Sequence, residues 1–301
     1  MPTIKNYIAI VFAMIFWSVS FIWTRIAIDS FQPVTLISLR LLIASVLLFI
    51  VIASARKLQK IRWTDLKWFV LLAFFEPYLY YMGETYGLTM VESTLASVIV
   101  STIPLFAPIL AFFVLKERIS MANILGIFVS LGGVVLVIYE PNGGFSANPL
   151  GVALLFLAVF AAICYSAILR KISSHYKTIN IIFYQIIIGL FFFIPTFFVT
   201  DFGSLQQIII TRDAIVSLLM LSVFASVIAF VLFADVVRKI GVARSNVFVN
   251  LIPVFTAIFA KIFLNEDLNW IKAIGIVVVV AGLFVSQFAG TKLKQIKGTQ
   301  Y

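Results

Sequence analysis

Residues 101–137 read STIPLFAPILAFFVLKERISMANILGIFVSLGGVVLV, and residues 250–286 read NLIPVFTAIFAKIFLNEDLNWIKAIGIVVVVAGLFVS. Without a gap, eleven of the 37 aligned positions are identical, and each pair lies 149 residues apart. The identities include proline, glutamate and glycine, which a general bias toward apolar residues would not place. They are Ile103/Ile252, Pro104/Pro253, Phe106/Phe255, Ile109/Ile258, Ala111/Ala260, Leu115/Leu264, Glu117/Glu266, Gly126/Gly275, Ile127/Ile276, Val129/Val278 and Gly133/Gly282. The chain therefore contains two copies of one unit.

The composition indicates a membrane protein. Hydrophobic residues make up 63% of the 301 residues and charged residues 11%, whereas soluble domains carry about 25% charged residues. Mean hydropathy is +1.14. The single cysteine, Cys164, lies in an apolar run, so we expect neither a disulfide framework nor a metal cluster. No cofactor is expected.

Apolar runs predict ten membrane-spanning helices, because a bilayer core about 30 Å thick needs about 20 apolar residues of helix. The first run follows Lys5 like a signal peptide, but no small-x-small cleavage site follows it, so we expect a retained helix. The predicted spans are 6–24, 34–54, 67–85, 92–114, 120–139, 149–169, 178–199, 213–235, 244–263 and 270–288.

The positive-inside rule orients these spans. With both termini in the cytoplasm, 17 of the 22 Lys and Arg residues fall on the cytoplasmic side. Each half then has five spans, an odd number, so the second half enters the membrane from the opposite side. The expected fold is all-α, with inverted five-helix repeats at 1–145 and 146–290 and a cytoplasmic tail at 291–301. Basic loops facing an anionic leaflet account for the net charge of +10 without a nucleic-acid partner.

Several short motifs occur in order along the chain. They are Phe16-Trp17-Ser18 with Arg25, Pro33 with Arg40, Ile103-Pro104-Leu105-Phe106, Lys239 through Arg244, Ile252-Pro253-Val254-Phe255, and Glu266 before Gly275 and Gly282. With these motifs the sequence resembles the EamA branch of the drug/metabolite transporter superfamily along nearly its whole length. The resemblance implies ten helices in two inverted repeats, and export or exchange of small metabolites across the bacterial inner membrane. It does not imply a substrate.

Ionisable residues at membrane depth are functional candidates. Glu76 lies near the middle of the third predicted span, next to Pro77, which removes a backbone donor. Tyr80 and Glu84 follow at helical spacing on the same face. We expect this face to line a substrate cavity, where Glu76 could carry a proton or bind an ammonium group. The alternative is a neutral structural Glu76 hydrogen-bonded to another helix.

Prolines and polar residues also mark the fourth and ninth predicted spans. Proline at the same position of both copies, Pro104 and Pro253, predicts paired kinks that let the helices flex. Asn246, Asn250 and Lys261 share one face of the ninth span, and Ser101 lies on the repeat-related face of the fourth. These polar residues could line the cavity or pack helix against helix, and Lys261 could extend to the interface.

Arg40 is expected inside the second span, with Glu84 as its ion-pair partner in a structural clamp or an outer gate. At an offset of 145, Arg40 corresponds to Gln185 in the seventh span, so the charge exists in one half only. Trp17 and Tyr165 are further candidates for the cavity wall. Asp235, at the cytoplasmic end of the eighth span, is expected to pair with Arg238 or Lys239. The repeated glutamates of the turns, Glu117 and Glu266, are expected to cap or bridge helices.

These features favour a secondary transporter working by alternating access on an amino-acid-like, cationic or zwitterionic metabolite, with proton coupling an open option. Its partners would be the substrate and the bilayer, and it would be a monomer or weak homodimer. A channel, sensor or receptor is the alternative, although a channel usually needs a charge ring or selectivity loop. An intramembrane enzyme is disfavoured, because the chain has one His, one Cys and no catalytic cluster.

Overall fold

The computed structural model describes residues 4–56, 58–106, 108–109, 120–140, 144–145, 147–173, 175–203, 209–240 and 242–298. Helices dominate, and large apolar side chains such as Phe128, Phe191 and Val199 are exposed on the outside, as expected for a surface in contact with lipid. In the first half, the elements are α1 (Ile4–Ile28), α2 (Pro33–Ser54), α3 (Trp63–Ala73), the π-helical segment η1 (Phe74–Leu79), α4 (Tyr80–Met90), α5 (Ser93–Val100) and α7 (Met121–Ile138).

The second half repeats this order after a short hairpin. Six helices among the described residues are long and apolar enough to cross a membrane, and shorter apolar helices supply further crossings. The elements are β1 (Tyr139–Glu140), β2 (Gly144–Phe145), α8 (Pro149–Ile172), α9 (Thr178–Thr200), α10 (Arg212–Met220), the π-helical segment η3 (Leu221–Ala229), α11 (Phe230–Ile240), α12 (Val242–Val249), α13 (Ile252–Phe263) and α14 (Trp270–Gly298). Helical segments thus cover the ten predicted spans wherever the structure describes them, and several of these segments are interrupted.

Helix ends follow local sequence signals. Proline occupies the first turn of α2, α8 and α13, where its missing N–H costs no hydrogen bond. Asn148 caps α8 by accepting from Leu150 and Gly151. At α7, Ser120 and Asn123 form a reciprocal capping box.

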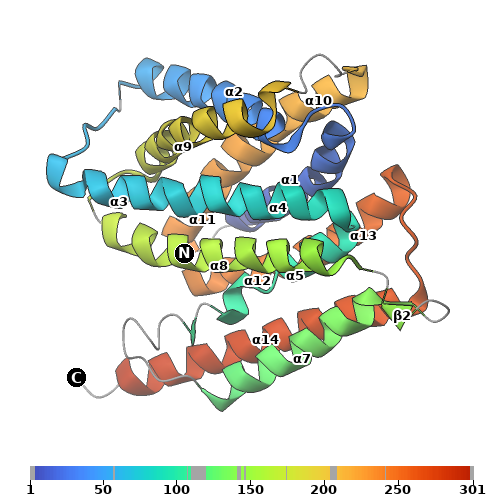
Figure 1. Ribbon diagram of the computed structural model, residues 1–301. Coiled ribbons are helices and arrows are strands. Elements are labelled where there is room, and N and C mark those ends of the chain that lie inside the picture. Colours follow the sequence, from blue (N-terminus) through green and yellow to red (C-terminus); the bar gives the residue numbers. More distant parts are fainter. Residues whose placement is uncertain are drawn as a thin grey trace.

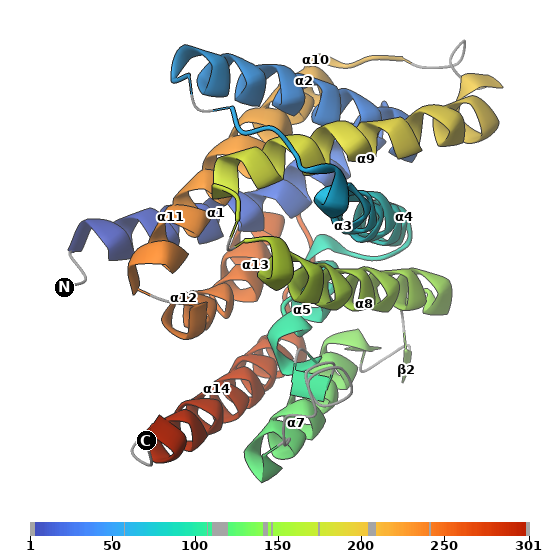
Figure 2. The same cartoon turned by 90° about the vertical axis from the view of Figure 1, so that its left-hand side faces the viewer.

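The helices pack in a pattern that relates the halves. Figures 1 and 2 show α2, α9 and α10 on one side of the molecule, α4 and α8 in the middle, and α7 beside α14 on the other side. The third helical region (α4) packs on the sixth (α8), and the eighth (α10, η3, α11) packs on the first (α1). These two contacts are equivalent under exchange of the halves.

The α7–α14 interface depends on four glycines. A Cβ atom on Gly126 would lie 2.6 Å from the carbonyl oxygen of Gly282, and one on Gly133 would lie 2.7 Å from that of Gly275. Small residues therefore let the two backbones approach closely. The first glycine of α7 meets the second glycine of α14, so the two repeat-related helices run antiparallel.

A short hairpin joins the two halves of this otherwise helical fold. β1 and β2 form an antiparallel pair with Tyr139 opposite Phe145 and Glu140 opposite Gly144. Within the segment 291–301, α14 continues through Gly298.

The paired proline kinks take a specific form. In both copies the helix breaks just before the proline, at Ser101–Thr102 and at Asn250–Leu251, 149 residues apart. Tight turns close both breaks: Thr102 N–H donates to Ile99 and Leu251 N–H donates to Phe248, each to the carbonyl three residues earlier. Pro104 and Pro253 then lie in the first turn of the next helical stretch, the position that proline tolerates.

Candidate functional site

The third helical region is broken at Glu76. Its backbone angles are φ −144° and ψ 118°, an extended conformation between α3 and α4. Glu76 lies 13 residues after Trp63 and 14 before Met90, at the centre of the region. Irregular backbone at membrane depth is tolerated only where it is buried in protein or borders a water-accessible space. Such a break exposes backbone polar groups, and it is a recurrent feature of substrate sites in transporters.

Gly189 of α9 makes room for this break. A Cβ atom there would collide with Cγ of Pro77 and lie 2.8 Å from its Cδ. The proline ring therefore rests directly against the α9 backbone. This contact holds the irregular segment against the second half of the chain.

A buried polar cluster surrounds the break. Tyr80 donates a hydrogen bond of 2.9 Å from its hydroxyl to Oε1 of Glu84. Arg40 of α2 donates from Nε to Oγ of Ser226 at 2.7 Å, and its guanidinium carbon lies 4.4 Å from the centre of the Tyr81 ring. Ser226 belongs to η3, so the cluster joins three helical regions from both halves.

The predicted ion pair between Arg40 and Glu84 is not formed. Among the described residues the ion pairs are Lys239–Asp235 and Lys272–Glu92. Arg40 is held instead by a hydroxyl and an aromatic face, both of which suit a guanidinium, and Glu84 is held by Tyr80. The first of those ion pairs, at 2.6 Å, confirms the expected partner of Asp235.

The cluster holds two carboxylates and one guanidinium, all nearly enclosed. Glu76, Glu84 and Arg40 expose 9%, 7% and 6% of their surfaces. Glu76 is close enough to interact electrostatically with both Glu84 and Arg40. With all three ionised, one negative charge is in excess. A buried charge is costly unless it is compensated, so this arrangement favours a bound cation or proton.

Arg40 and Glu76 also keep unused bonding capacity. The terminal nitrogens of Arg40 and the carboxylate oxygens of Glu76 make no hydrogen bond to any residue that the structure describes. Within the same residues, the fully enclosed side-chain polar atoms without a partner are Oγ of Ser38 and Oγ of Ser93. The free atoms of Arg40 and Glu76 therefore border space that water can reach.

Tyr165 and Gln185 complete the cluster from the second half. The hydroxyl of Tyr165 on α8 donates to Oε1 of Gln185 on α9 at 3.1 Å. Tyr165 also interacts electrostatically with Glu76 and Tyr81. The structure thus brings six predicted site residues into one neighbourhood: Arg40, Glu76, Tyr80, Glu84, Tyr165 and Gln185.

Other predicted residues lie elsewhere or serve local contacts. Trp17 packs against Phe230 and Phe233 of α11, with ring centres 5.2 and 5.0 Å away. Ser101 donates to the carbonyl of Val98 in its own helix at 2.7 Å, a helix-internal role. Asn250 is buried in the break before α13.

Of the remaining ninth-span candidates, the structure places Lys261 away from the cluster. Lys261 is exposed near the end of α13, beside the exposed side chains of Ile258 and Ile262. This position fits a lysine that extends to the interface. The side chain of Asn246 lies outside the described part of the chain.

Sequence reasoning missed three residues of the site: Ser226, Tyr81 and Gly189. Ser226 follows Ser222 by one helical turn, but small polar residues are common where membrane helices pack, so this signal is weak. Tyr81 is one of two adjacent tyrosines, and only the fold shows that its ring faces Arg40. The role of Gly189 depends on a proline more than 100 residues away in the chain.

The repeat-related glutamate of the second half has a structural role. Both carboxylate oxygens of Glu266 accept hydrogen bonds from the first residues of α5: Ser93 N at 2.7 Å, Thr94 N at 3.0 Å and Thr94 Oγ1 at 2.7 Å. A carboxylate at a helix N-terminus also complements the helix dipole. The expected capping role of Glu266 is confirmed, and the cap comes from the other half of the chain. Glu117 lies outside the described residues.

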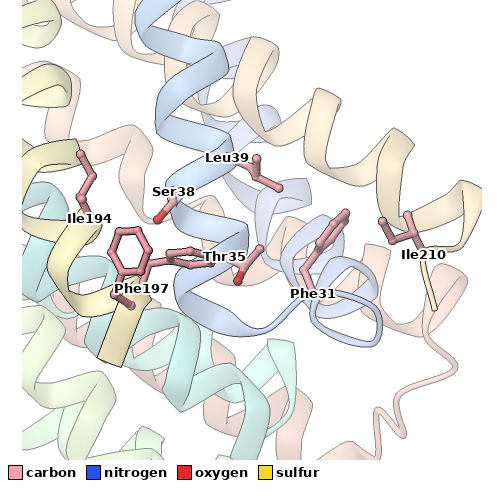
Figure 3. A pocket seen from close by; sticks show the side chains of 8 residues that line it. Phe31, Thr35, Ser38, Leu39, Ile194, Phe197 and Ile210 are labelled. Carbon is pink, nitrogen blue, oxygen red and sulfur yellow. The ribbon is translucent and has the colours of Figure 1, made fainter. Parts of the chain in front are cut away.

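Two pockets open on the outside of the molecule, and no predicted site residue lines either. The first has a volume of about 480 Å³ and lies between α2 and the C-terminal part of α9 (Figure 3). Its walls are apolar except for Thr35 and Ser38. The second has a volume of about 820 Å³ and runs along α3.

Fold and cluster together define a polytopic helical membrane protein built from a duplicated unit, with an ionisable site at a broken helix. A model of the EamA-like transporter family matches residues 4–139 and again 149–288. The chain belongs to the EamA-like transporter family of the drug/metabolite transporter superfamily. It is a multi-pass membrane transporter and not an enzyme.

Relatives cover nearly the whole chain at low identity. An uncharacterized transporter of Archaeoglobus fulgidus is 27% identical over 93% of this chain and 98% of its own length. The uncharacterized transporter YetK of Bacillus subtilis is 26% identical over 93% of this chain and 86% of its own. A probable amino-acid metabolite efflux pump of Escherichia coli is 21% identical over 97% and 98%. A solved structure 17% identical in sequence shares the fold, with a TM-score of 0.69 over 97% of this chain and 99% of that one.

Proposed function

We propose that this protein is a secondary transporter that exports or exchanges an amino-acid-like zwitterion or cation by alternating access. The observation that carries the proposal is the break at Glu76, where a carboxylate with unused oxygens lies at the centre of a membrane-spanning region. Ionisable groups at this depth mark substrate or proton pathways. The relative described as a probable amino-acid metabolite efflux pump supports the substrate class.

Glu76 and Arg40 each bind one charged group of such a substrate. Glu76 binds the ammonium group, while the terminal nitrogens of Arg40 offer a fork that matches a carboxylate. Ser226 and Tyr81 hold the guanidinium without consuming that fork. When the site is empty of substrate, a proton on Glu76 takes the place of the substrate's ammonium group, which is the basis for proton coupling.

In this proposal, the breaks in the helices are the hinges at which the two halves move between access states. The turns at Ser101–Thr102 and Asn250–Leu251 occur at equivalent positions of the two halves, and the antiparallel packing of α7 and α14 supports inverted repeats. In our proposal the halves span 1–145 and 146–290, both termini are cytoplasmic, and residues 291–301 form a cytoplasmic tail. We place the protein in the bacterial inner membrane, as a monomer or weak homodimer. The substrate path is lined by Trp17, Ser101, Asn246 and Asn250. The conformational change between the two access states depends on Pro104, Pro253 and Lys261.

A ligand screen on purified protein tests the substrate class. Amino acids, polyamines and nucleosides are added to wild type, to Glu76→Gln and to Asp235→Asn, and the melting temperature is measured. A bound ligand stabilises the native state by mass action, so amino acids or polyamines should raise the melting temperature of wild type and Asp235→Asn. Asp235 is an exposed carboxylate outside the cluster and serves as the matched control.

Glu76→Gln should bind the same compounds about 10- to 100-fold more weakly, since a charged hydrogen bond contributes about 1.5–3 kcal/mol. Stabilisation by nucleosides alone, or equal responses of wild type and Glu76→Gln, would refute the proposed recognition.

A further inference from the structure

The pocket along α3, called the groove below, follows one face of that helix. It is lined by apolar residues of α3 and by Phe74 and Phe192 beyond them, and Lys67 is its charged residue. Trp63 stands at one end, 89% exposed. Tryptophan is typical of the boundary between headgroups and acyl chains, so this end of the groove lies at the membrane surface.

The length of the groove matches one leaflet. From Trp63 to Phe74 the chain advances 11 residues, which is about 16 Å at helical rise. Half of the hydrocarbon core of a bilayer is about 15 Å. A single acyl chain laid along Val70 and Leu71 would therefore reach from the surface to Phe74, near the middle of the membrane.

Two lysines lie around one indole ring, about one helical turn from Trp63. Nζ of Lys171, from α8, lies 3.7 Å from the centre of the Trp68 ring, and Nζ of Lys67 lies 5.6 Å from it. Neither lysine takes part in the ion pairs found among the described residues. The carboxylate of Asp65, two residues from Lys67, accepts a hydrogen bond from Tyr176. Two ammonium groups from different helices thus lie around one ring, and neither forms an ion pair with a carboxylate among the residues that the structure describes.

We propose that this groove is a binding site for one anionic phospholipid. The phosphate lies between Lys67 and Lys171, and an acyl chain lies along Val70, Leu71 and Phe74. Basic pockets between membrane helices bind anionic headgroups in this way, and the apolar walls select a lipid over a soluble anion. The lysines lie on the side that the positive-inside rule assigns to the cytoplasm, where anionic lipids are enriched.

The position of Phe74 gives this lipid a link to the candidate site. Phe74 is the first residue of η1 and precedes Glu76 by two residues. The end of the bound chain therefore contacts the segment whose backbone is broken. The lipid site itself does not depend on the transported substrate, so a binding measurement tests it independently of the proposed transport.

Native mass spectrometry of the purified full chain tests this site. The protein is titrated with phosphatidylglycerol and with phosphatidylcholine of matched acyl chains, and the lipid-bound fraction is measured. Wild type should retain phosphatidylglycerol in preference. The double variant Lys67→Gln/Lys171→Gln should bind it about 30-fold more weakly, the factor expected for two lysine charges near an anionic headgroup.

The matched control is Lys60→Gln/Lys177→Gln, which removes two exposed charges from the same side without altering the groove lining. It should keep the wild-type preference. Equal binding of the two lipids by wild type, or equal losses in both double variants, would overturn the proposal.

A third variant tests the acyl chain. Leu71→Trp fills the groove and leaves every charge in place, so it should lower retention of phosphatidylglycerol while the protein still melts cooperatively. Undiminished retention would show that the lipid does not occupy the groove.

Discussion

At the residue scale, the contacts of Arg40 show how a buried guanidinium can be held in place while its terminal nitrogens stay free to bind a ligand. Its Nε donates to Ser226 and its guanidinium lies over the ring of Tyr81. These contacts hold it in place without an ion-pair partner among the described residues. The two nearby carboxylates differ in their hydrogen bonding. Glu84 accepts a hydrogen bond from Tyr80, whereas Glu76 accepts none from the described residues. In our proposal, this difference makes Glu76 the carboxylate that binds the substrate.

Replacing Arg40 by lysine separates charge from geometry. Arg40→Lys keeps the positive charge but loses the planar fork and the aromatic stack. Affinity for a zwitterionic amino acid should fall about 10- to 100-fold, whereas affinity for the corresponding amine, which lacks the carboxylate, should be unchanged. Binding of both compounds to purified protein measures this. Equal losses for both would mean that Arg40 does not contact the carboxylate.

Part of this site could be predicted from the sequence. The helical spacing of Glu76, Tyr80 and Glu84 places them on one face, and membrane depth makes each conspicuous. The partner of Arg40 could not be predicted, because Ser226 lies 186 residues away and its approach depends on how the two halves pack. Spacing along one helix is a local property, whereas contacts between halves are not.

At the element scale, helix breaks and close backbone contacts shape the molecule. The proline at equivalent positions of the repeat predicted where the helices bend. It did not show that the helix is interrupted just before each proline, at Ser101–Thr102 and Asn250–Leu251. In each turn a backbone N–H donates to the carbonyl three residues earlier. No single residue type predicts such a turn.

The contact between Gly189 and Pro77 should be sensitive to one methyl group. Gly189→Ala places a Cβ against the proline ring, and overpacking of this kind costs about 1–3 kcal/mol. The melting temperature should fall. Gly132→Ala on α7 is the control, because a Cβ there meets nothing within 4 Å and alanine favours a helix. A Gly189→Ala protein as stable as Gly132→Ala would contradict the close packing at the break.

The cap supplied by Glu266 should also contribute to stability. Glu266→Gln weakens a cap on α5 that comes from the other half of the chain, and loss of an N-cap costs about 1 kcal/mol. We expect a lower melting temperature than for Asp267→Asn, which changes the neighbouring exposed carboxylate. Identical melting curves for the two variants would show that the cap contributes little.

At the scale of the whole molecule, the duplicated unit and the antiparallel packing of α7 and α14 support our proposal of two oppositely oriented halves. The composition alone predicted a membrane protein, and the charge distribution predicted its topology. The antiparallel contact of α7 and α14 was not visible in the sequence, although the four glycines that form it are all part of the repeat.

Site-directed labelling tests the inversion. Asp29 follows the first helix of its half and His175 follows the first helix of the other, and both are exposed. In a Cys164→Ser background, Asp29→Cys should react with a membrane-impermeant maleimide in intact cells, and His175→Cys only after permeabilisation. Labelling of both from the same side would mean that the halves are parallel.

The central claim is that this transporter carries its substrate through a site centred on Glu76. Counterflow tests it most directly: proteoliposomes loaded with an unlabelled amino acid from the ligand screen are diluted into a trace of the labelled compound. Wild type and Asp235→Asn should show transient accumulation of label that saturates with concentration, and Glu76→Gln should show none. Simple equilibration without accumulation in wild type would indicate a channel, and full accumulation by Glu76→Gln would contradict the role of Glu76.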